Sequence, residues 1–421
     1  MEYQLQINKM IEASAREVFA PVMYAFVSWV LKKAEQEKIK RLYFLARDGY
    51  QMYLTARILC AEQGYPVECR YLKCSRFALR VPAFHLQGNN CLEFICQGGI
   101  DVTLRKVLKR TGMNEQEAAA MAERLGKTEE FDKVMSYQEV QQLKGYFCNS
   151  PKLMEWIFDN SKKAYPDAAG YLRQEGLLEP ISYAIVDSGW IGTLQQTLQQ
   201  ILKNEGRAEV LRGFYFGLYE LPQNVEPQMY DAFYFSPYGK IRRKVYFSNS
   251  LFECIFGAPE GMTLRYQKDT QGYEAVLEQK ENRNRIKIEQ TTDAVCKYVK
   301  ELAREQRIIS AEDVERVLSR FMGEPKREEV EEFGNWKFTD DVLEEKQQIV
   351  AANLSEEELS KNHFLYKSLI MLGLKKGPVH ESAWIEGSTV RCGRRIRKHL
   401  RQIRWYKYVL YLRKEILEKR K

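Results

Sequence analysis

The sequence predicts an α/β fold: a Rossmann-like parallel sheet with helical insertions, followed by a helical C-terminal region. Three short apolar runs, at residues 42–46, 67–72 and 183–186, have the length of buried strands and are too short for helices. Segments of helical periodicity lie between them, and alternation of strands with helices is typical of parallel sheets. Charged residues and glycines follow the runs, and ligands bind at the carboxyl ends of parallel strands.

The first part of the chain is expected to alternate helix and strand. The expected elements are a helix over 10–38, a strand over 42–46, a helix over 50–63 and a strand over 67–72. A loop at 47–49 follows the first strand, and the second strand ends near Ser75 and Arg76. We expect these loops and the loop at 187–193 to lie at the same edge of one sheet.

Residues 181–200 are the stretch around which the rest is organised. An apolar strand over 183–186 meets an acidic loop, Asp187-Ser188-Gly189, and a helix opens at Thr193. The start of that helix offers unpaired backbone N–H groups to an anion. The alternative is an ordinary strand-to-helix turn in which Asp187 or Ser188 caps something structural.

The remaining segments are expected to be mainly helical. Residues 77–160 are interpreted as a helical insertion or cap over the sheet, with helices over 104–109 and 114–125, and a separate helix is predicted over 166–175. A further strand is predicted over 210–218, and Glu253 lies in a short apolar segment before a turn at 258–262. Charged helical patterns without a strand follow from 267 to 361, where Ser355 and Glu358 form a capping box. The predicted domains are an α/β domain over 1–266, a helical domain over 267–390 and a basic amphipathic helical tail over 391–421.

Composition narrows the class of protein. A chain of 421 residues with 45% apolar residues can bury a sizeable core. Nine cysteines without zinc-finger spacing favour a reducing compartment and argue against a metal site, and the four histidines share no motif. The first residues are polar where a signal peptide would have an apolar segment, so no signal peptide is expected. Pro21 and Ser28 interrupt the apolar segment 18–31, which is also too short to span a bilayer. We therefore expect a cytoplasmic protein.

The last 31 residues differ from the rest in charge. They carry thirteen Lys or Arg against two Glu, a local charge of +11, which leaves −3 for residues 1–390. Aliphatic residues recur there at helical spacing, with Trp405 and three tyrosines among the cations. This pattern suits a helix on an anionic membrane face, and it also suits a helix packed on the body. Nucleic acid is the least favoured binding partner of this helix.

Three motifs in order resemble a known family. These are FLARDG at 44–49, YLKCSR at 71–76 and VDSGWIGTLQ at 186–195, followed by an acidic stretch with Glu253 before an APEG turn. The sequence is similar to the region that follows the haloacid-dehalogenase-like domain in large predicted hydrolases of bacterial surface-polysaccharide gene clusters. The resemblance spans roughly residues 10 to 266. The resemblance implies a biological context, namely capsule or O-antigen biosynthesis. It does not identify a reaction.

The chemistry of dehalogenase-like phosphatases does not fit this chain. Their strand is followed by Asp-x-Asp, which supplies a nucleophile and a general acid, whereas here Asp48 is followed by Gly49 and Tyr50. A phosphoaspartate mechanism is therefore not expected.

A second resemblance, to type I phosphoribosyltransferases, concerns two loops. In that family an Arg-Gly-Gly-like loop holds pyrophosphate, and an acidic, Gly/Thr-rich loop holds the ribose and its 5′-phosphate. Loops 47–49 and 187–193 look like these two, in the same order. Ser188 stands where a second acid is expected, and Trp190 is bulky for a phosphate loop.

The sequence thus predicts a protein that binds, and acts on, a phosphorylated sugar or nucleotide-sugar. The alternatives are a non-catalytic ligand-binding or scaffolding subunit for glycosyltransferases, and a phosphoribosyltransferase-like enzyme. No cofactor is predicted with certainty, although a divalent cation could accompany a phosphorylated ligand. The predicted catalytic residues are Asp48, Asp187 and Glu253. The predicted binding residues are Arg47, Gly49, Ser75, Arg76, Ser188, Gly189, Trp190, Gly192, Thr193 and Gln195.

Overall fold

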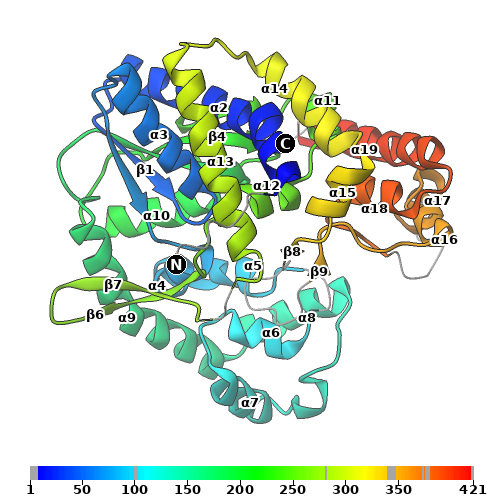
Figure 1. Ribbon diagram of the computed structural model, residues 1–421. Coiled ribbons are helices and arrows are strands. Elements are labelled where there is room, and N and C mark those ends of the chain that lie inside the picture. Colours follow the sequence, from blue (N-terminus) through cyan, green and yellow to red (C-terminus); the bar gives the residue numbers. More distant parts are fainter. Residues whose placement is uncertain are drawn as a thin grey trace, which may run out of the picture.

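A five-stranded parallel sheet forms the centre of the computed structural model, which describes residues 8–98, 102–279, 282–338, 348–371, 374 and 380–418. The strands lie in the order β2-β1-β3-β4-β5, all parallel (Figure 1). Their bounds are β1 Arg41–Leu45, β2 Glu68–Leu72, β3 Tyr183–Trp190, β4 Arg212–Leu218 and β5 Tyr230–Phe235. The predicted Rossmann-like α/β fold is confirmed.

Helices cover both faces of the sheet (Figure 1). One face packs in a core with α2 (Ala20–Gln36), α3 (Gly49–Gln63) and α13 (Arg285–Arg304). The other packs with α4 (Arg76–Gln87), α9 (Pro151–Gln174) and α10 (Thr193–Asn204). Side chains alternate between the faces, so that Phe44 and Val186 enter the first core and Leu45 and Ile185 enter the second. Burial on both sides explains why the central part of β1 and the first four residues of β3 are apolar.

The strand order creates a crevice at one edge of the sheet. The chain passes from β1 outward to β2, and the next strand, β3, lies on the opposite side of β1. At such a switch point the loops after the two central strands diverge and leave room for a ligand. Phe44 pairs with Val186 in the parallel register, so the segments after both strands emerge together. The prediction that loops 47–49 and 187–193 share an edge is confirmed.

The helices at the start of the chain follow the expectation over 10–38. Helix α1 (Lys9–Ser14), a π-helical turn at Ala15–Phe19 and α2 run without a break up to Gln36. Helix α3 also lies where it was expected.

Residues 88–98 and 102–158 form a helical lobe with its own apolar core. Its helices are α5 (Leu92–Ile95), α6 (Leu104–Lys109), α7 (Glu115–Arg124), α8 (Tyr137–Cys148) and the first part of α9. The predicted helical character of 77–160 is confirmed, but α4 belongs to the cover of the sheet. The predicted helix over 166–175 is confirmed up to Gln174, but it is not separate, because α9 is continuous through Pro166. Leu153, Ile157 and Leu172 are buried along it, and this packing outweighs the loss of one backbone hydrogen bond at proline.

Several strands of the structure were not predicted from the sequence. The edge strand β5 lies in the aromatic stretch after β4, and β6 (Thr263–Lys268) pairs with β7 (Tyr273–Leu277) as an antiparallel hairpin. The expectation of no strand after 267 is therefore wrong, and two short strands, β8 (Lys337–Phe338) and β9 (Gln348–Ile349), pair later. These segments lack a continuous apolar run because they are half exposed.

The C-terminal half packs on the body. Its helices are α11 (Ile241–Val245), α12 (Asn249–Phe256), α14 (Ala311–Leu318), α15 (Arg327–Phe333), α16 (Glu356–Lys361), α17 (Phe364–Met371), α18 (Ile385–Cys392) and α19 (Ile396–Glu418). Val295, Phe321 and Trp384 belong to the same core as β1 and β3, so that core extends across residue 266. The capping box of Ser355 and Glu358 is confirmed, at the start of α16. Within the described ranges, no helix is long and apolar enough to cross a membrane.

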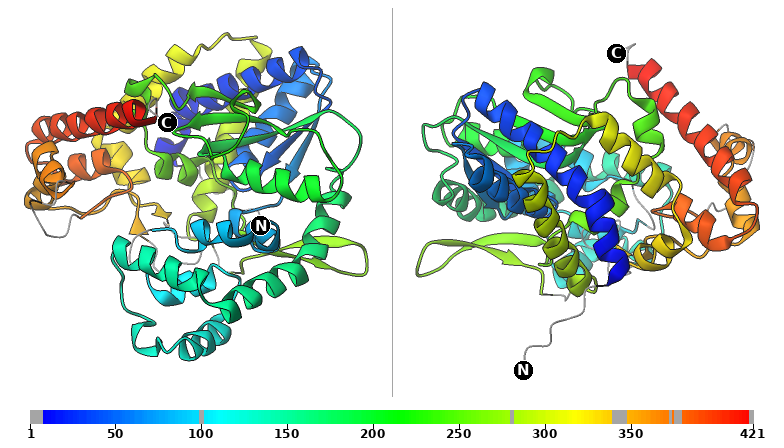
Figure 2. Two further views of the ribbon diagram at one scale, coloured as in Figure 1. Left: turned by 180° about the vertical axis from the view of Figure 1, so that it is seen from behind. Right: turned by 45° about the horizontal axis from the view of Figure 1, so that its top comes forward.

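Helix α19 lies along the outside of the molecule (Figure 2). Its inner side is held by buried Leu400 and Ile403 and by an ion pair of 2.6 Å between Lys407 and Glu386. The predicted helical tail is confirmed up to residue 418, and residues 419–421 lie outside the described ranges.

Candidate functional site

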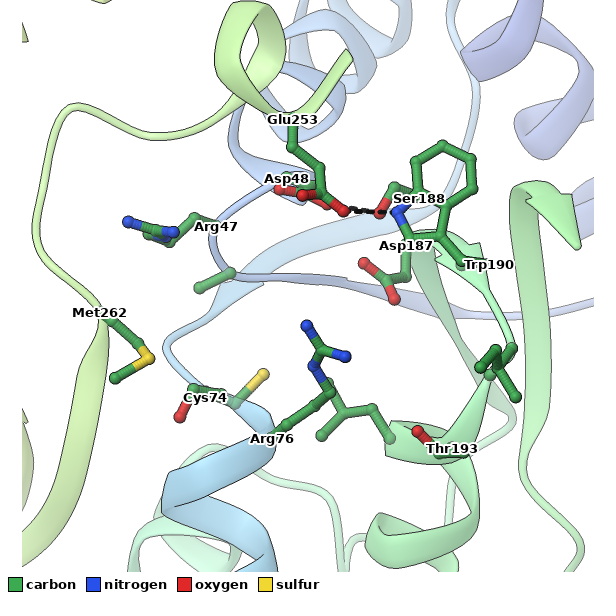
Figure 3. A pocket seen from close by; sticks show the side chains of 16 residues that line it. Arg47, Asp48, Cys74, Arg76, Asp187, Ser188, Trp190, Thr193, Glu253 and Met262 are labelled. Carbon is green, nitrogen blue, oxygen red and sulfur yellow. Dashed lines mark hydrogen bonds between the residues drawn. The ribbon is translucent and has the colours of Figure 1, made fainter. Parts of the chain in front are cut away.

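A cavity of about 180 Å³ opens at the carboxyl edge of β1 and β3 (Figure 3). It is lined from the loops after β1, β2 and β3 and from α12. The lining residues are Ala46, Arg47, Asp48, Cys74, Ser75, Arg76, Asp187, Ser188, Gly189, Trp190, Ile191, Gly192, Thr193, Leu194, Glu253 and Met262. All three predicted catalytic residues are among them.

Asp48 is placed by the turn from β1 into α3. It precedes the first residue of α3, yet its side chain makes no capping hydrogen bond to that helix. Its carboxylate instead accepts a hydrogen bond from the hydroxyl of Ser188, at the end of β3. This bond joins the two central strand ends directly.

The end of β3 reaches further than the sequence indicated. Pairing with β4 continues to Trp190, so the predicted acidic loop is the last part of the strand. Gly189 has φ +104°, and a Cβ there would lie 2.6 Å from the carbonyl oxygen of Gly217. Gly192 has φ +76°, and a Cβ there would lie 2.8 Å from the Tyr230 ring. Both glycines are required by the backbone.

Asp187 and Ser188 do not have the alternative role of capping the helix that follows this turn. Gly192 is the N-cap of α10, and no side chain caps that helix. Neither Asp187 nor Ser188 caps it. The first turn of α10 therefore presents its backbone N–H groups beside the cavity.

Glu253 enters the cavity from α12, far along the chain. Its Oε1 accepts a hydrogen bond of 2.5 Å from the indole N–H of Trp190. The Trp190 ring lies among Tyr219, Phe235 and Phe252, which hold it in place.

Burial raises the pKa of all three carboxyl groups, and repulsion from Asp48 adds to the shift of the other two. Desolvation, followed by repulsion from Asp48, raises the pKa of Asp187 to about 8. The same two causes raise the pKa of Glu253 to about 7. Desolvation also raises the pKa of Asp48, although the Ser188 hydroxyl and the nearby arginines oppose this shift. Carboxyl groups that titrate near neutral pH can act as general acids or bases, and such shifts cluster at functional sites.

Two arginines supply positive charge at the same cavity. Arg47 and Arg76 are exposed and line it, and both lower the pKa of Asp48 and Glu253. A guanidinium group binds phosphate in a planar, bidentate geometry. Exposed arginines beside a free helix N-terminus make this side of the cavity suited to an anion.

A third arginine, Arg80, lies behind the cavity and was not predicted. It is only 9% exposed, donates a hydrogen bond of 2.7 Å to Thr193 Oγ1 and lies 4.1 Å from the centre of the Phe94 ring. Within the described part of the chain no carboxylate forms an ion pair with it. Desolvation, and then repulsion from Arg76, lowers its pKa to about 9. The sequence feature that could have pointed to Arg80 is its spacing of four residues from Arg76, which places both on the same side of a helix.

Not every predicted binding residue lines the cavity. Gly49 begins α3, and a Cβ there would lie 2.9 Å from the Phe44 backbone, so its role is in packing. Gln195 is buried; it donates to the Leu211 carbonyl and accepts from the Tyr215 hydroxyl, both at 2.6 Å. Neither residue belongs to the cavity wall. Ser75 does, but its hydroxyl caps α4 and donates to the Thr263 carbonyl.

Five cavity residues were absent from the prediction: Ala46, Cys74, Ile191, Leu194 and Met262. Cys74 and Met262 are the two that carry sulfur. Cys74 lies inside the YLKCSR motif, and Met262 in the turn after Glu253. Both are buried, and desolvation raises the pKa of the Cys74 thiol well above its ordinary value. Their positions within the quoted motifs were the only signal.

Across the described ranges, no three His, Cys, Asp or Glu side chains are placed to hold a metal ion together. The four histidines share no sequence motif, but two of them are in contact in the structure. His363 Nε2 lies 2.8 Å from Nδ1 of His399, which is 1% exposed. This pair joins α19 to the segment just before α17, remote in sequence from the cavity residues.

The arrangement combines an anion-binding side with an acidic side. Arg47, Arg76 and the start of α10 can bind a phosphoryl group, while Asp187 and Glu253 can accept or donate hydrogen bonds to hydroxyl groups. Comparison with known proteins adds no assignment: no protein family model matches the chain, and no curated protein matches it.

Proposed function

We propose that this protein binds, and acts on, a phosphorylated sugar or nucleotide-sugar in the cavity at the edge of β1 and β3. The observation that carries the proposal is the convergence of Arg47, Asp48, Arg76, Asp187 and Glu253 on one cavity. These residues come from four separate segments of the chain. A folded chain that served only as a scaffold has no need to bring three carboxyl groups together against their repulsion.

The ligand class follows from the two kinds of group in the cavity. A phosphoryl group binds between the arginines and the N-terminus of α10, and Arg80 adds positive charge behind Thr193. Sugar hydroxyls bind to Asp187 and Glu253, which offer both acceptor and, when protonated, donor oxygens. A phosphorylated sugar carries both kinds of group.

The biological context comes from the sequence motifs alone. Their resemblance to the region that accompanies haloacid-dehalogenase-like hydrolases supports a role in bacterial surface-polysaccharide biosynthesis. The scaffolding alternative, a subunit that binds ligand for glycosyltransferases, remains the runner-up because it needs the same ligand and no chemistry. A phosphoribosyltransferase-like reaction is less well supported, because the Trp190 ring belongs to the aromatic cluster beside the cavity.

A screen of ligands tests the proposal. The unfolding midpoint of the full chain is measured with nucleotide-sugars, phosphoribosyl pyrophosphate, hexose phosphates and inorganic phosphate. A ligand that binds the folded state raises the midpoint, by an amount that grows with its concentration. We expect a shift with a phosphorylated sugar that exceeds the shift with inorganic phosphate. No shift with any member of the panel would contradict the proposal.

A second proposal concerns the outer side of α19. Trp405, Val409, Leu412 and Ile416 are all exposed there, at helical spacing that places them on one side of the helix. Exposed Arg397, Lys398, Arg401 and Arg413 accompany this stripe. Aliphatic and aromatic residues flanked by cations suit an anionic membrane surface, where both kinds of interaction act together. We therefore propose peripheral contact with the inner face of the membrane, and Trp405 is the residue we expect to matter most.

A further inference from the structure

A second, larger cavity adjoins the candidate site. Its volume is about 440 Å³, and it lies between the end of β3, α12 and the C-terminal helices. Trp190 and Ile191 line both cavities, so the two share a wall. The inner side of α19 supplies Tyr406, Lys407 and Tyr411 to this second cavity.

Aromatic rings form much of its wall. Trp190, Tyr219, Tyr406 and Tyr411 line it, and the rings of Tyr219 and Tyr411 are stacked with centroids 5.6 Å apart and planes 8° apart. The faces of aromatic rings carry partial negative charge, and the C–H groups on one side of a sugar ring carry partial positive charge. An aromatic wall of this kind therefore suits a sugar ring that stacks on it.

The charges in the second cavity differ from those in the first. Lys407 pairs with Glu386 at 2.6 Å, and Lys367 pairs with Glu381 at 3.2 Å while lying 5.0 Å from the centre of the Tyr406 ring. These two cations are thus already neutralised, and the third lysine of the lining, Lys414, is balanced in charge by Glu220 in the same lining. Asn249, Asn362, Ser248 and Ser382 add neutral polar groups. The lining favours a neutral, hydroxyl-rich ligand over a phosphate.

We propose that the second cavity binds the sugar part of a glycan, a second ligand next to the phosphorylated one. This inference rests on the proposed function, because the shared wall matters only if the first cavity also holds a ligand. Trp190 and Ile191 would then lie between the two ligands, at the end of β3. One cavity suits an anionic ligand and the other suits a neutral ligand. The two cavities together therefore fit two different ligands of one reaction or one complex.

Binding to an array of bacterial capsule and O-antigen oligosaccharides tests the proposal. The full chain is applied to the array, and the affinity for the best-bound oligosaccharide is then measured by calorimetry. Tyr406→Ala removes a ring from the cavity wall, and Trp405→Ala, the adjacent residue, removes an exposed ring from the outer side of the same helix. We expect Tyr406→Ala to weaken binding about tenfold. Trp405→Ala should leave the affinity unchanged within about twofold.

Three outcomes would overturn the proposal. They are no binding to any oligosaccharide, equal effects of the two variants, or loss of binding in Asp187→Asn, which would place the glycan in the first cavity. Tyr406→Phe serves as a second variant if Tyr406→Ala unfolds, because it keeps the ring and should retain binding. Phosphorylated-sugar binding without oligosaccharide binding would refute this inference and leave the proposed function standing. Oligosaccharide binding alone, without any phosphorylated ligand, would refute the proposed function.

Discussion

The indole N–H of Trp190 donates a hydrogen bond of 2.5 Å to Oε1 of Glu253, which joins the end of β3 to α12. The bond fixes a carboxyl group beside Asp48 and Asp187, and the Trp190 ring is also part of the wall between two cavities. A single residue at the strand end therefore influences both the charge of the candidate site and its boundary.

Replacing Trp190 with phenylalanine should raise the pKa of Glu253 above about 7. The indole donor stabilises the charged carboxylate and lowers its pKa, so its removal favours the protonated form. Phenylalanine keeps an aromatic ring among the neighbouring rings. Carboxyl ¹³C NMR titration of selectively labelled glutamate measures the change, with Glu253→Gln to assign the signal. Trp405→Phe, at an exposed position, should leave this pKa unchanged. A lower or unaltered pKa in Trp190→Phe would show that the bond does not control Glu253.

Asp187→Asn should weaken binding of the phosphorylated ligand by about ten- to a hundredfold. Above its pKa of about 8 the Asp187 carboxyl is ionised, and a hydrogen bond to a charged group contributes about 1.5–3 kcal/mol, so at such a pH this substitution removes the charge with little change in shape. The variant should remain folded, because Asp187 caps no helix at this turn. Calorimetric titration with the ligand found by the screen gives the ratio. Asp159→Asn, the same change at an exposed site on α9, is the control and should bind like the wild type. Equal affinities of the two variants would remove Asp187 from the binding site.

The same variant should alter how stability depends on pH. Asp187 has a pKa of about 8 when folded and about 3.9 when unfolded, so between these values the folded state holds a proton that the unfolded state has lost. The free energy of unfolding of the wild type therefore falls as pH rises through this window, by at most about 1.4 kcal/mol per pH unit from this group. Asp187→Asn removes this contribution. Urea unfolding at pH 5 and pH 8 should show the variant gaining stability relative to the wild type at the higher pH. A difference that is constant or shrinks with pH would mean that Asp187 is ionised in the folded state.

Arg80→Met should weaken phosphate binding without loss of stability. A buried cation without an ion pair costs free energy of desolvation, and an apolar side chain of similar length avoids that cost. Its positive charge and its bond to Thr193, however, favour an anion at the start of α10. We expect a several-fold loss of affinity for the phosphorylated ligand together with an equal or higher free energy of unfolding. Arg124→Met, at an exposed site on α7, should change neither. Destabilisation with unchanged affinity would make Arg80 a structural residue.

The outer side of α19 should bind anionic vesicles. Each Lys or Arg near such a surface contributes roughly 1 kcal/mol, screened by salt over about 8–10 Å. Trp405→Ala/Leu412→Ala should reduce co-sedimentation with vesicles that contain phosphatidylglycerol, and salt should weaken the binding of the wild type. Truncation at residue 390 is a poor test, since it would also expose the apolar residues that α19 covers. Ile308→Ala/Leu365→Ala removes two exposed apolar side chains elsewhere and should have no effect. Equal sedimentation of both double variants, or no wild-type binding at all, would refute membrane contact.

The strands that carry the site could be predicted because they are buried on both faces. β1 and the first four residues of β3 are apolar runs for this reason, and the charged residues after β1 mark the end of that strand. β5, β6 and β7 are half exposed, so their mixed composition resembles that of helices and loops. The predicted end of β3 was also too early, because pairing with β4 extends the strand beyond the apolar run at 183–186.

The membership of the site could be predicted only in part. Residues close to strand ends, such as Asp48 and Asp187, follow from topology, and Glu253 was found through motif resemblance. Gln195 was misassigned because its position in the motif gives no sign of its buried bonds to Leu211 and Tyr215. Arg80 escaped because its importance depends on burial and on the lack of an acidic partner among the described residues, which a sequence pattern does not display.

The most direct test of the central claim is a crystal structure of the full chain bound to the phosphorylated ligand that most raises its unfolding midpoint. We predict the phosphoryl group beside Arg47, Arg76 and the first turn of α10, with sugar hydroxyls within hydrogen-bonding distance of Asp187 or Glu253. A ligand bound elsewhere on the protein, or bound with its phosphoryl group away from both arginines, would contradict the account.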